Sequence, residues 1–235
     1  MRLAILQPAY LPWIGYFDQI AQSDAFVFYD DVQFDKQSWQ NRNQIKTPQG
    51  TQWLSVPVHT RNKPQIKDIL IDNHKDWRKD HLKSIQVNYS RAPFFEKYIW
   101  ILDAIYSISW ERLAVLDTTL IELINKFLGI ETPLFFSSKL DIPHTGQVQR
   151  LIDICQHFGA NEFLEGSAGR NYLSGDGEKL FQQNGIKITY HDYQHPVYFQ
   201  QHGEFVPYLS VIDLLFNNGT KSLEILTHKK EMTTS

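Results

Sequence analysis

Acidic, basic and amide side chains are concentrated in residues 30–46, which read DDVQFDKQSWQNRNQIK. In such a mixture arginine can grip phosphate or carboxylate oxygens with two parallel hydrogen bonds, and aspartate can hold Mg²⁺ through water. A polar run is usually a solvated loop, but Phe34 and Trp39 interrupt this one, which favours a loop folded over a ligand. We therefore predict an anion-binding site, with catalytic candidates Asp30, Asp31, Lys36 and Arg42 and binding candidates Gln33, Trp39, Asn41, Asn43 and Lys46.

A second candidate segment lies shortly before it, QPAYLPWIGYF at residues 7–17. Gly15 falls inside the start of a predicted helix, where glycine costs about 1 kcal/mol relative to alanine. Close approach by a ligand or by a neighbouring backbone would explain this glycine. The alternative is a turn set by its prolines, in which the aromatic rings only pack. The binding candidates of this segment are Gln7, Tyr10, Trp13, Gly15 and Tyr16.

A glycine-bracketed turn, EGSAGR at residues 165–170, supplies a third candidate. Ser167, Gly169 and Arg170 combine a hydroxyl, a permissive backbone position and a guanidinium, and such a turn can cradle phosphate. It can equally be an ordinary strand-to-helix loop, because the chain contains no GxxxxGK[ST] phosphate-binding motif.

Two other combinations favour structural roles. His191 and His195 stand four residues apart, but Pro196 argues against the helix that would bring both to one face. We therefore predict no metal-binding residues. Ser210 and Asp213 precede a predicted helix, and their spacing is typical of a variant capping box rather than of a catalytic serine–acid pair.

The elements around these segments should bring them to one edge of a sheet. Residues 2–7 and 25–29 are short apolar runs typical of buried strands, and a helix is expected between them from near Pro12. In a parallel sheet, ligands bind beyond the carboxyl ends of the strands. The two polar segments follow these predicted strands directly.

The rest of the chain predicts the fold class. A strand is expected at 53–58, helices over 75–128, and alternating strands and helices from 133 onward. This rhythm predicts an α/β fold with a Rossmann-like parallel sheet. We expect a single α/β domain over residues 1–235, with a helical insertion or cap at about 75–128.

Composition narrows the class of protein. The 235 residues are 42% hydrophobic and 21% charged, which is typical of a packed globular protein rather than a disordered one. A formal net charge of -3 argues against a nucleic-acid-binding protein. Cys155 is the only cysteine, which excludes a disulfide within the chain. The sequence has neither a signal-peptide pattern nor an apolar run of membrane-spanning length, so we predict a cytoplasmic protein.

The order of motifs along the chain resembles the WbqC-like protein family. The matching segments are QPAYLPWIGYF, DDVQFDKQSWQNRNQIK, WLSVPV, GSAGRNYLSGDGEKLF and LSVIDLLFNNG, which together span nearly the whole chain. This family is associated with bacterial gene sets for surface polysaccharides such as O-antigen. The resemblance therefore implies a role in the biosynthesis of polysaccharide precursors.

A more distant likeness concerns LPWIGYFDQI, which is similar to the PxHxGHxxLI motif of nucleotidylyl transferases and pantothenate synthetases. Gly15 matches the glycine of that motif, and Trp13 and Tyr16 stand where that superfamily has two histidines. Those histidines stabilise the transition state at the α-phosphate, so their replacement argues against nucleotidylyl transfer by that mechanism. Ser167 and Arg170 resemble the second phosphate loop of the superfamily, and the likeness implies a nucleotidylyl transferase-like sheet.

Together the resemblances imply an enzyme that uses ATP and Mg²⁺ to modify a sugar precursor. Its most concrete form is a ligase that joins a small carboxylate, such as an amino acid, to the amine of a nucleotide-linked amino sugar. These two small molecules are the expected partners, with no nucleic acid. Two alternatives stay open, a nucleotidylyl transferase and a non-catalytic protein that binds sugar nucleotides.

The implied roles divide the candidate residues into three sets. Phosphate or carboxylate charge would be held by the cations Lys36, Arg42, Lys46 and Arg170. Mg²⁺ or the attacking amine would be received by Asp30 and Asp31. The substrate would be oriented by Gln7, Tyr10 and Tyr16.

Overall fold

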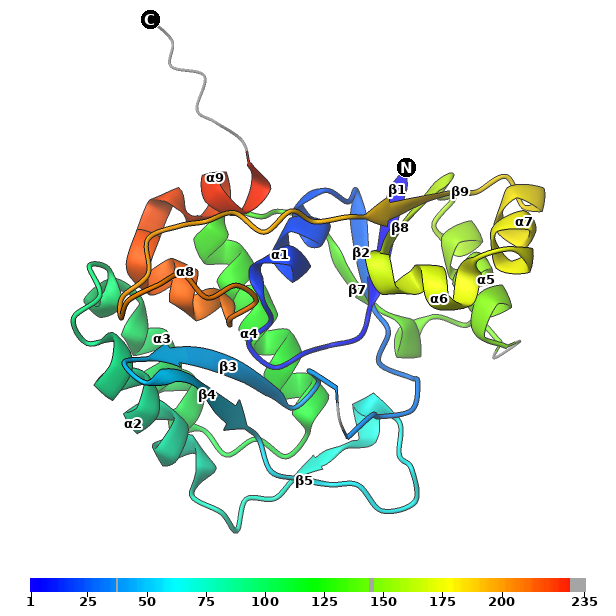
Figure 1. Cartoon of the computed structure of the whole chain (residues 1–235). Helices are drawn as coiled ribbons and strands as arrows, with labels where there is room; N and C mark the ends of the chain where they lie inside the picture. The colour runs from blue at the N-terminus through cyan, green and yellow to red at the C-terminus, as the bar shows by residue number, and fades with distance from the viewer. Residues whose placement is uncertain (37, 144–145, 229–235) are drawn as a thin grey trace, which may run out of the picture. The chain divides into compact units, whose positions relative to one another are not determined.

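Two compact units make up the described part of the chain. The computed structural model describes residues 1–36, 38–143 and 146–228 (Figure 1). One unit, called the sheet unit, comprises Met1–Gln7, Gln19–Asp31 and Glu131–Gln194. The other, called the helical unit, comprises the described residues of Pro8–Asp18, Val32–Ile130 and His195–Ser235. The organisation as one domain stays a prediction.

The sheet unit is built on five parallel strands in the order β7-β2-β1-β8-β9 (Figure 1). Their bounds are β1 Arg2–Leu6, β2 Ala25–Phe28, β7 Leu134–Phe136, β8 Glu162–Gly166 and β9 Lys187–His191. Going along the chain, the strands are added first on one side of β1 and then on the other. This is the order of a Rossmann-like fold, so the predicted α/β class with a parallel sheet is confirmed.

Apolar residues of both the strands and the helices form the core of the sheet unit. The helices are α5 Gln147–His157, α6 Arg170–Leu173 and α7 Asp176–Gln183, with short 3₁₀ turns η2 Ser137–Lys139 and η3 Ser167–Gly169. Cys155 of α5 and Phe181 of α7 join Leu3 of β1 in one buried cluster. The alternate residues Ala4 and Phe26 are fully buried as well. Burial of both strand faces is what a parallel sheet requires.

The helical unit contains the predicted helical stretch. Its helices are α2 Trp77–Tyr89, α3 Phe95–Ser107, α4 Leu113–Leu128, α8 Val211–Asn218 and α9 Ser222–Thr227, with 3₁₀ turns η1 Ile66–Asp68 and η4 Gly219–Lys221. Gly129 ends α4 in the left-handed conformation at φ 75°, as the sequence predicts. Helix α1, Ile14–Ala21, begins in the helical unit and ends in the sheet unit.

Two antiparallel hairpins belong to the helical unit. The first pairs β3 Arg42–Thr47 with β4 Gly50–Ser55, and the second pairs β5 Val58–His59 with β6 Leu70–Ile71. For residues 32–62 the sequence predicted one strand, at 53–58, and a loop in the segment where β3 lies. The register of the first hairpin buries Asn43 and Ile45 on alternate positions, so a strand forms in a segment with few apolar residues.

No helix among residues 1–36, 38–143 and 146–228 is long and apolar enough to cross a membrane.

Candidate functional site

The sheet unit places several predicted residues at the carboxyl edge of its strands. The order of strands reverses between β1 and β8, and ligands of open α/β sheets bind beyond the strand ends at such a reversal. Gln7 directly follows β1, and Ser167 and Gly169 directly follow β8. The sequence predicted that the loops after the first two strands lie at one sheet edge, and β1 and β2 are indeed parallel neighbours. Their role in binding a ligand stays a prediction.

Asp30 and Asp31 follow β2 at the same edge, and both are buried. The carboxylate of Asp30 accepts hydrogen bonds from the Ser138 backbone at 3.0 Å and from its hydroxyl at 2.7 Å. Asp31 accepts a hydrogen bond of 2.5 Å from the Ser137 hydroxyl and pairs with Arg150 at 2.5 Å, where both side chains are 3% exposed. These contacts tie the end of β2 to the turn after β7. They favour a structural role for the two carboxylates, while their proposed contact with Mg²⁺ stays a prediction.

Glu165 is a residue of this edge that the sequence analysis missed. It is 7% exposed, accepts a hydrogen bond from the Gly166 backbone at 3.0 Å, and accepts another from the Tyr172 hydroxyl at 2.9 Å. Burial raises the pKa of its carboxyl to about 7, against the lowering effect of these two hydrogen bonds. A carboxyl group that titrates near neutral pH is suited to accept and return a proton.

Gly169 has a steric reason to be glycine. A β-carbon at this position would lie 2.2 Å from Cγ of Glu165, so any larger residue would displace that side chain. Gly169 therefore makes room for the buried carboxylate. The phosphate-cradling role that the sequence suggested for this turn stays a prediction.

Arg170 stands at the start of α6 with its guanidinium exposed. It forms two hydrogen bonds of 2.6 Å with the two carboxylate oxygens of Asp192, and it lies 4.2 Å above the ring of Tyr190. The hydrogen bond to Asp192 raises the pKa of Arg170, and the pKa of Asp192 falls for the same reason. Arg170 is therefore held at the sheet edge in a fixed orientation.

In the helical unit, Tyr10 points into the interior. It is fully buried, and its hydroxyl contacts Nδ1 of His81 at 2.9 Å and also the hydroxyl of Tyr106. Burial raises its pKa well above the usual value for tyrosine. Tyr16 is 7% exposed, and burial raises its pKa as well. The surroundings of Tyr10 favour the packing role that the sequence left open.

The indole of Trp13 occupies the space that a side chain at position 15 would need. A β-carbon at Gly15 would lie 2.2 Å from Cη2 of the Trp13 indole. The close neighbour is therefore the ring of Trp13, folded over the start of α1, and not the ligand or backbone that the sequence suggested. The indole in turn packs against Tyr208, with ring centroids 5.3 Å apart, and stacks on His195 at 6.1 Å.

Lys46 and Asn43 of β3 are both buried, at 2% exposure. The Lys46 ammonium donates to Oε1 of Gln200 at 3.1 Å and to the backbone carbonyl of Glu204. Burial lowers the pKa of Lys46. The amide of Asn43 donates to the carbonyl of Leu11 at 2.6 Å. Both side chains thus satisfy buried backbone groups or amides inside the helical unit.

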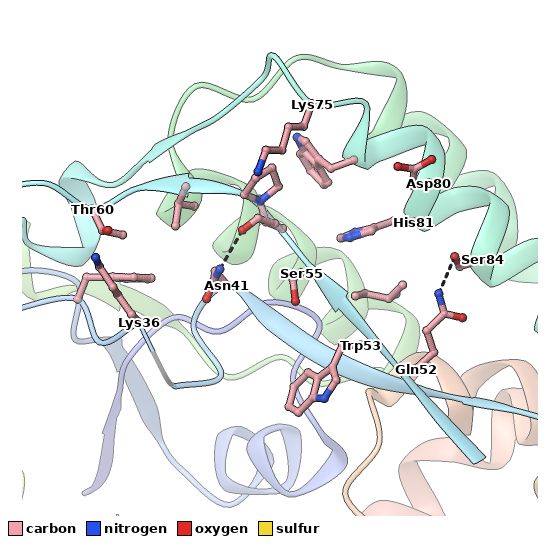
Figure 2. Close-up of a pocket in the computed structure, with 16 residues that line it drawn as sticks. Lys36, Asn41, Gln52, Trp53, Ser55, Thr60, Lys75, Asp80, His81 and Ser84 are labelled. Carbon is pink, nitrogen blue, oxygen red and sulfur yellow. Dashed lines mark hydrogen bonds between the residues drawn. The ribbon is translucent and has the colours of Figure 1, made fainter. Parts of the chain in front are cut away.

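A pocket of about 620 Å³ lies in the helical unit and includes two predicted residues, Lys36 and Asn41 (Figure 2). Strand β4 and helix α2 form two of its walls, and the hydrogen bond of 3.1 Å from Gln52 to Ser84 joins them. The remaining labelled residues of the lining are Trp53, Ser55, Thr60, Lys75, Asp80 and His81. Pockets of this size commonly hold small ligands.

Two other predicted residues stand beside this pocket. The Trp39 ring lies 5.3 Å from that of Trp53, and the guanidinium of Arg42 lies 4.6 Å above Trp53. Gln33 is exposed and forms an isolated bridge with Gln65. The loop before β3 therefore places Lys36 and Asn41 in the pocket lining and Trp39 against the lining residue Trp53.

His81 and Asp213 are further titratable residues that the sequence analysis did not assign to the site. Burial lowers the pKa of His81 to about 4, so its ring is neutral at pH 7. Burial raises the pKa of Asp213 to about 6. Asp213 accepts hydrogen bonds from Tyr89 at 2.8 Å and from Tyr198 at 3.0 Å.

The predicted capping box at α8 is wrong. Ser210 is the residue before the helix, but its side chain makes no capping hydrogen bond. The Asp213 carboxylate instead accepts hydrogen bonds from two tyrosine hydroxyls, because the fold places them beside it.

His191 and His195 do not share a helix, as Pro196 led us to expect: His191 ends β9, and His195 lies in an extended segment. In the described ranges, no three His, Cys, Asp or Glu side chains are grouped so that they could hold a metal ion.

Comparison with known proteins identifies the relatives of this chain. A family model described as the WbqC-like protein family matches residues 7–225. The uncharacterized protein Rv1507c of Mycobacterium tuberculosis (strain ATCC 25618 / H37Rv) is 37% identical over 234 residues, which cover 98% of this chain and 99% of that protein. No solved structure matches.

Proposed function

This chain belongs to the WbqC-like protein family, and we propose that it joins a small carboxylate to the amine of a nucleotide-linked amino sugar in an ATP-dependent reaction. Family membership suggests a role in polysaccharide-related biosynthesis. The amide-forming reaction, its substrates and its residues are the proposal. Its product would be a modified sugar precursor for a surface polysaccharide.

The observation that carries the proposal is the position of Glu165 at the strand reversal of a Rossmann-like sheet. Nucleotides bind beyond the carboxyl ends of such strands, where loop and helix N–H groups favour an anion. Gln7 follows β1 there, and the Ser167–Gly169 turn follows β8. Glu165 adds a carboxyl group whose pKa is about 7. Binding of ATP and proton transfer would then occur at one edge.

The proposed reaction has two steps. The carboxylate oxygen attacks the α-phosphorus of ATP, so that an acyl adenylate forms and pyrophosphate leaves. The sugar amine then attacks the acyl carbon, the bond to AMP breaks, and an amide remains. The nitrogen loses a proton in this second step, and Glu165 in its ionised form accepts it. Placing the two substrates together accounts for the rest of the rate enhancement.

Magnesium enters this proposal with ATP. Asp30 and Asp31 are poor direct ligands, because their oxygens already accept hydrogen bonds from Ser137, Ser138 and Arg150. Mg²⁺ would neutralise charge on the phosphates. The chain's own contribution at this edge would come from Gln7, the Ser167–Gly169 turn, Arg170 and Glu165.

The test is an assay of the full chain with ATP, Mg²⁺, a UDP-linked amino sugar and a mixture of amino acids. We expect release of AMP together with a product whose mass equals the two substrates less one water. Glu165→Gln should lower kcat by about 100-fold, the effect of losing a general base. The matched control is Glu178→Gln, which alters an exposed carboxylate of the same unit that hydrogen-bonds to Tyr190.

Two other outcomes would contradict the ligase, and a third would contradict the role of Glu165. Pyrophosphate released without free AMP, and with the nucleoside monophosphate of the triphosphate retained in the product, would identify a nucleotidylyl transferase. Tight binding of the sugar nucleotide without any product would identify a binding protein. Equal kcat for the wild type and Glu165→Gln would remove Glu165 from the reaction.

A further inference from the structure

We propose that the helical unit carries a binding surface for an acidic oligosaccharide of at least two sugar rings. The surface is formed by an aromatic row, defined as Tyr208, Trp13, Trp39 and Trp53, and by the pocket of about 620 Å³ at the end of that row. This inference goes beyond the proposed ligase reaction. It concerns a second class of ligand, whose binding can be measured without ATP.

The row is continuous from one hollow to the next. Tyr208 packs on Trp13 with centroids 5.3 Å apart, and both line a hollow of about 230 Å³ together with Trp39. Trp39 lies 5.3 Å from Trp53, and Trp53 lines the larger pocket. Two hollows separated by one pair of indoles match two or more consecutive rings of a chain-like ligand.

Three of the four aromatic side chains of the row are exposed. Tyr208 is 54% exposed, Trp39 48% and Trp53 43%. A group of large exposed aromatic rings marks a binding surface in a soluble fold, because leaving them in water costs free energy. The apolar C–H faces of sugar rings stack on indoles, while their hydroxyl groups reach polar neighbours. This is the combination that the row and the pocket offer.

The rings are held in place before any ligand arrives. Gly15 leaves the space into which the Trp13 indole folds. The backbone N–H of Tyr208 donates to Nε2 of His195 at 3.1 Å, and Tyr208 adopts a positive φ of 63°, which is strained for a bulky residue. Arg42 covers one face of Trp53 at 4.6 Å. A rigid platform loses little conformational entropy when it binds a ligand.

The lining of the larger pocket indicates which sugar it takes. Amide and hydroxyl groups of Asn41, Gln52 and Ser84 lie on its walls and suit neighbouring sugar hydroxyls (Figure 2). Lys36 and Lys75 both line the pocket, whereas Asp80 is its only lining carboxylate among the described residues. His81 is neutral at pH 7. The surplus of positive charge favours a carboxylate or another acidic group on the sugar.

The experiment measures binding by calorimetry and by tryptophan fluorescence, without nucleotide. The probe is a tetrasaccharide of alternating glucuronic acid and N-acetylglucosamine, and the neutral probe is a tetrasaccharide of N-acetylglucosamine. We expect the acidic probe to bind and Trp53→Ala to weaken it by about tenfold or more. Trp53→Phe should keep part of the affinity. Trp100→Ala is the matched control, since Trp100 is 57% exposed on α3 in the same unit and outside the row.

The charge of the ligand is tested separately. The double variant Lys36→Ala, Lys75→Ala should weaken the acidic probe by about tenfold at low salt, and added salt should reduce that difference. Binding of the neutral probe should not change between the double variant and the wild type.

Four results would overturn the inference. The first would be that the acidic tetrasaccharide does not bind. The second would be that the Trp53→Ala and Trp100→Ala variants bind it equally well. Free glucuronic acid binds as tightly as the tetrasaccharide, which would leave a single sugar site. UDP binds and Trp53→Ala abolishes that binding, which would make the row a nucleobase platform. None of these results bears on whether the chain releases AMP.

Discussion

The carboxyl edge of the sheet unit and the pocket of the helical unit hold their polar groups in opposite ways. At the sheet edge, Asp31 and Arg150 are both 3% exposed and paired, and Glu165 is buried with its own hydrogen-bond donors. At the pocket, Lys36 and Trp53 are exposed. Buried polar groups fix geometry and shift pKa values, whereas exposed ones are available to a ligand. Substitutions at the edge should therefore change stability as well as the proposed reaction, and substitutions at the pocket should change binding with little effect on stability.

The largest effect is expected from Arg150→Met. It leaves Asp31 buried without its cationic partner, and breaking a buried ion pair costs about 3–5 kcal/mol of unfolding free energy. Denaturant unfolding measures this loss. The matched control is Lys179→Ala, which removes an exposed pair with Asp176 in the same unit and should cost no more than about 0.5 kcal/mol. A loss below about 1 kcal/mol for Arg150→Met would contradict the structural role of the pair.

A second effect comes from the titration of Glu165. Its pKa is about 7 in the folded protein and 4.5 in the reference state, so between these values the folded protein binds more protons than the unfolded one. Stability from this residue is complete below pH 4.5 and is lost as the pH rises through 7, on the order of 3 kcal/mol in total. Glu165→Gln should remove this decline in unfolding free energy measured against pH.

Asp213 of the helical unit provides the comparison for that titration. Its pKa rises from 3.8 to about 6, so its own decline ends near pH 6. Asp213→Asn should therefore flatten the profile only below pH 6, and Glu165→Gln should also flatten it between 6 and 7. Identical profiles for the two variants would argue against separate titrations.

A smaller effect is expected from Gly169→Ala. The new β-carbon would meet Cγ of Glu165 at 2.2 Å, and overpacking of this kind costs about 1–3 kcal/mol. Gly177→Ala in α7 is the control, because its β-carbon would meet nothing closer than 3.5 Å. That control should be neutral or stabilising by about 0.5–1 kcal/mol in thermal unfolding. Equal losses in both variants would mean that Gly169 does not position Glu165.

The smallest change in stability is expected from Trp39→Ala. The ring is 48% exposed, so its removal should alter the unfolding free energy by no more than about 0.5 kcal/mol. The same change should weaken the acidic tetrasaccharide. Trp77→Ala sharpens the contrast, because Trp77 is 4% exposed and its truncation should cost about 3–5 kcal/mol. A large loss of stability in Trp39→Ala would make it a packing residue instead.

Local patterns were sufficient to predict the sheet unit. Short apolar runs predicted β1 and β2. In the helical unit, Gly129 marked the end of α4 in the same way. Because strand direction follows from the alternation of strands and helices, the sequence also predicted that the loops after β1 and β2 lie at one edge. These inferences depend on residues close together in the chain, where spacing carries the information.

Local patterns failed where a distant partner decides the environment. Lys46 is typical of an anion site by residue type, but the hairpin register buries it beside Gln200, 154 residues away. Tyr10 contacts Tyr106, 96 residues away, so its hydroxyl already forms a hydrogen bond inside the unit. The sequence assigned Asp213 to a helix cap, but its carboxylate accepts hydrogen bonds from tyrosines of other segments.

The sequence by itself determined the α/β class, the parallel sheet, the family and the loops that follow the strands, because periodicity and motif order are local properties. Only the tertiary structure decided which polar side chains are buried and which remain exposed. Burial depends on the segments that pack against a residue, and it sets both the pKa of Glu165 and the exposure of Trp53.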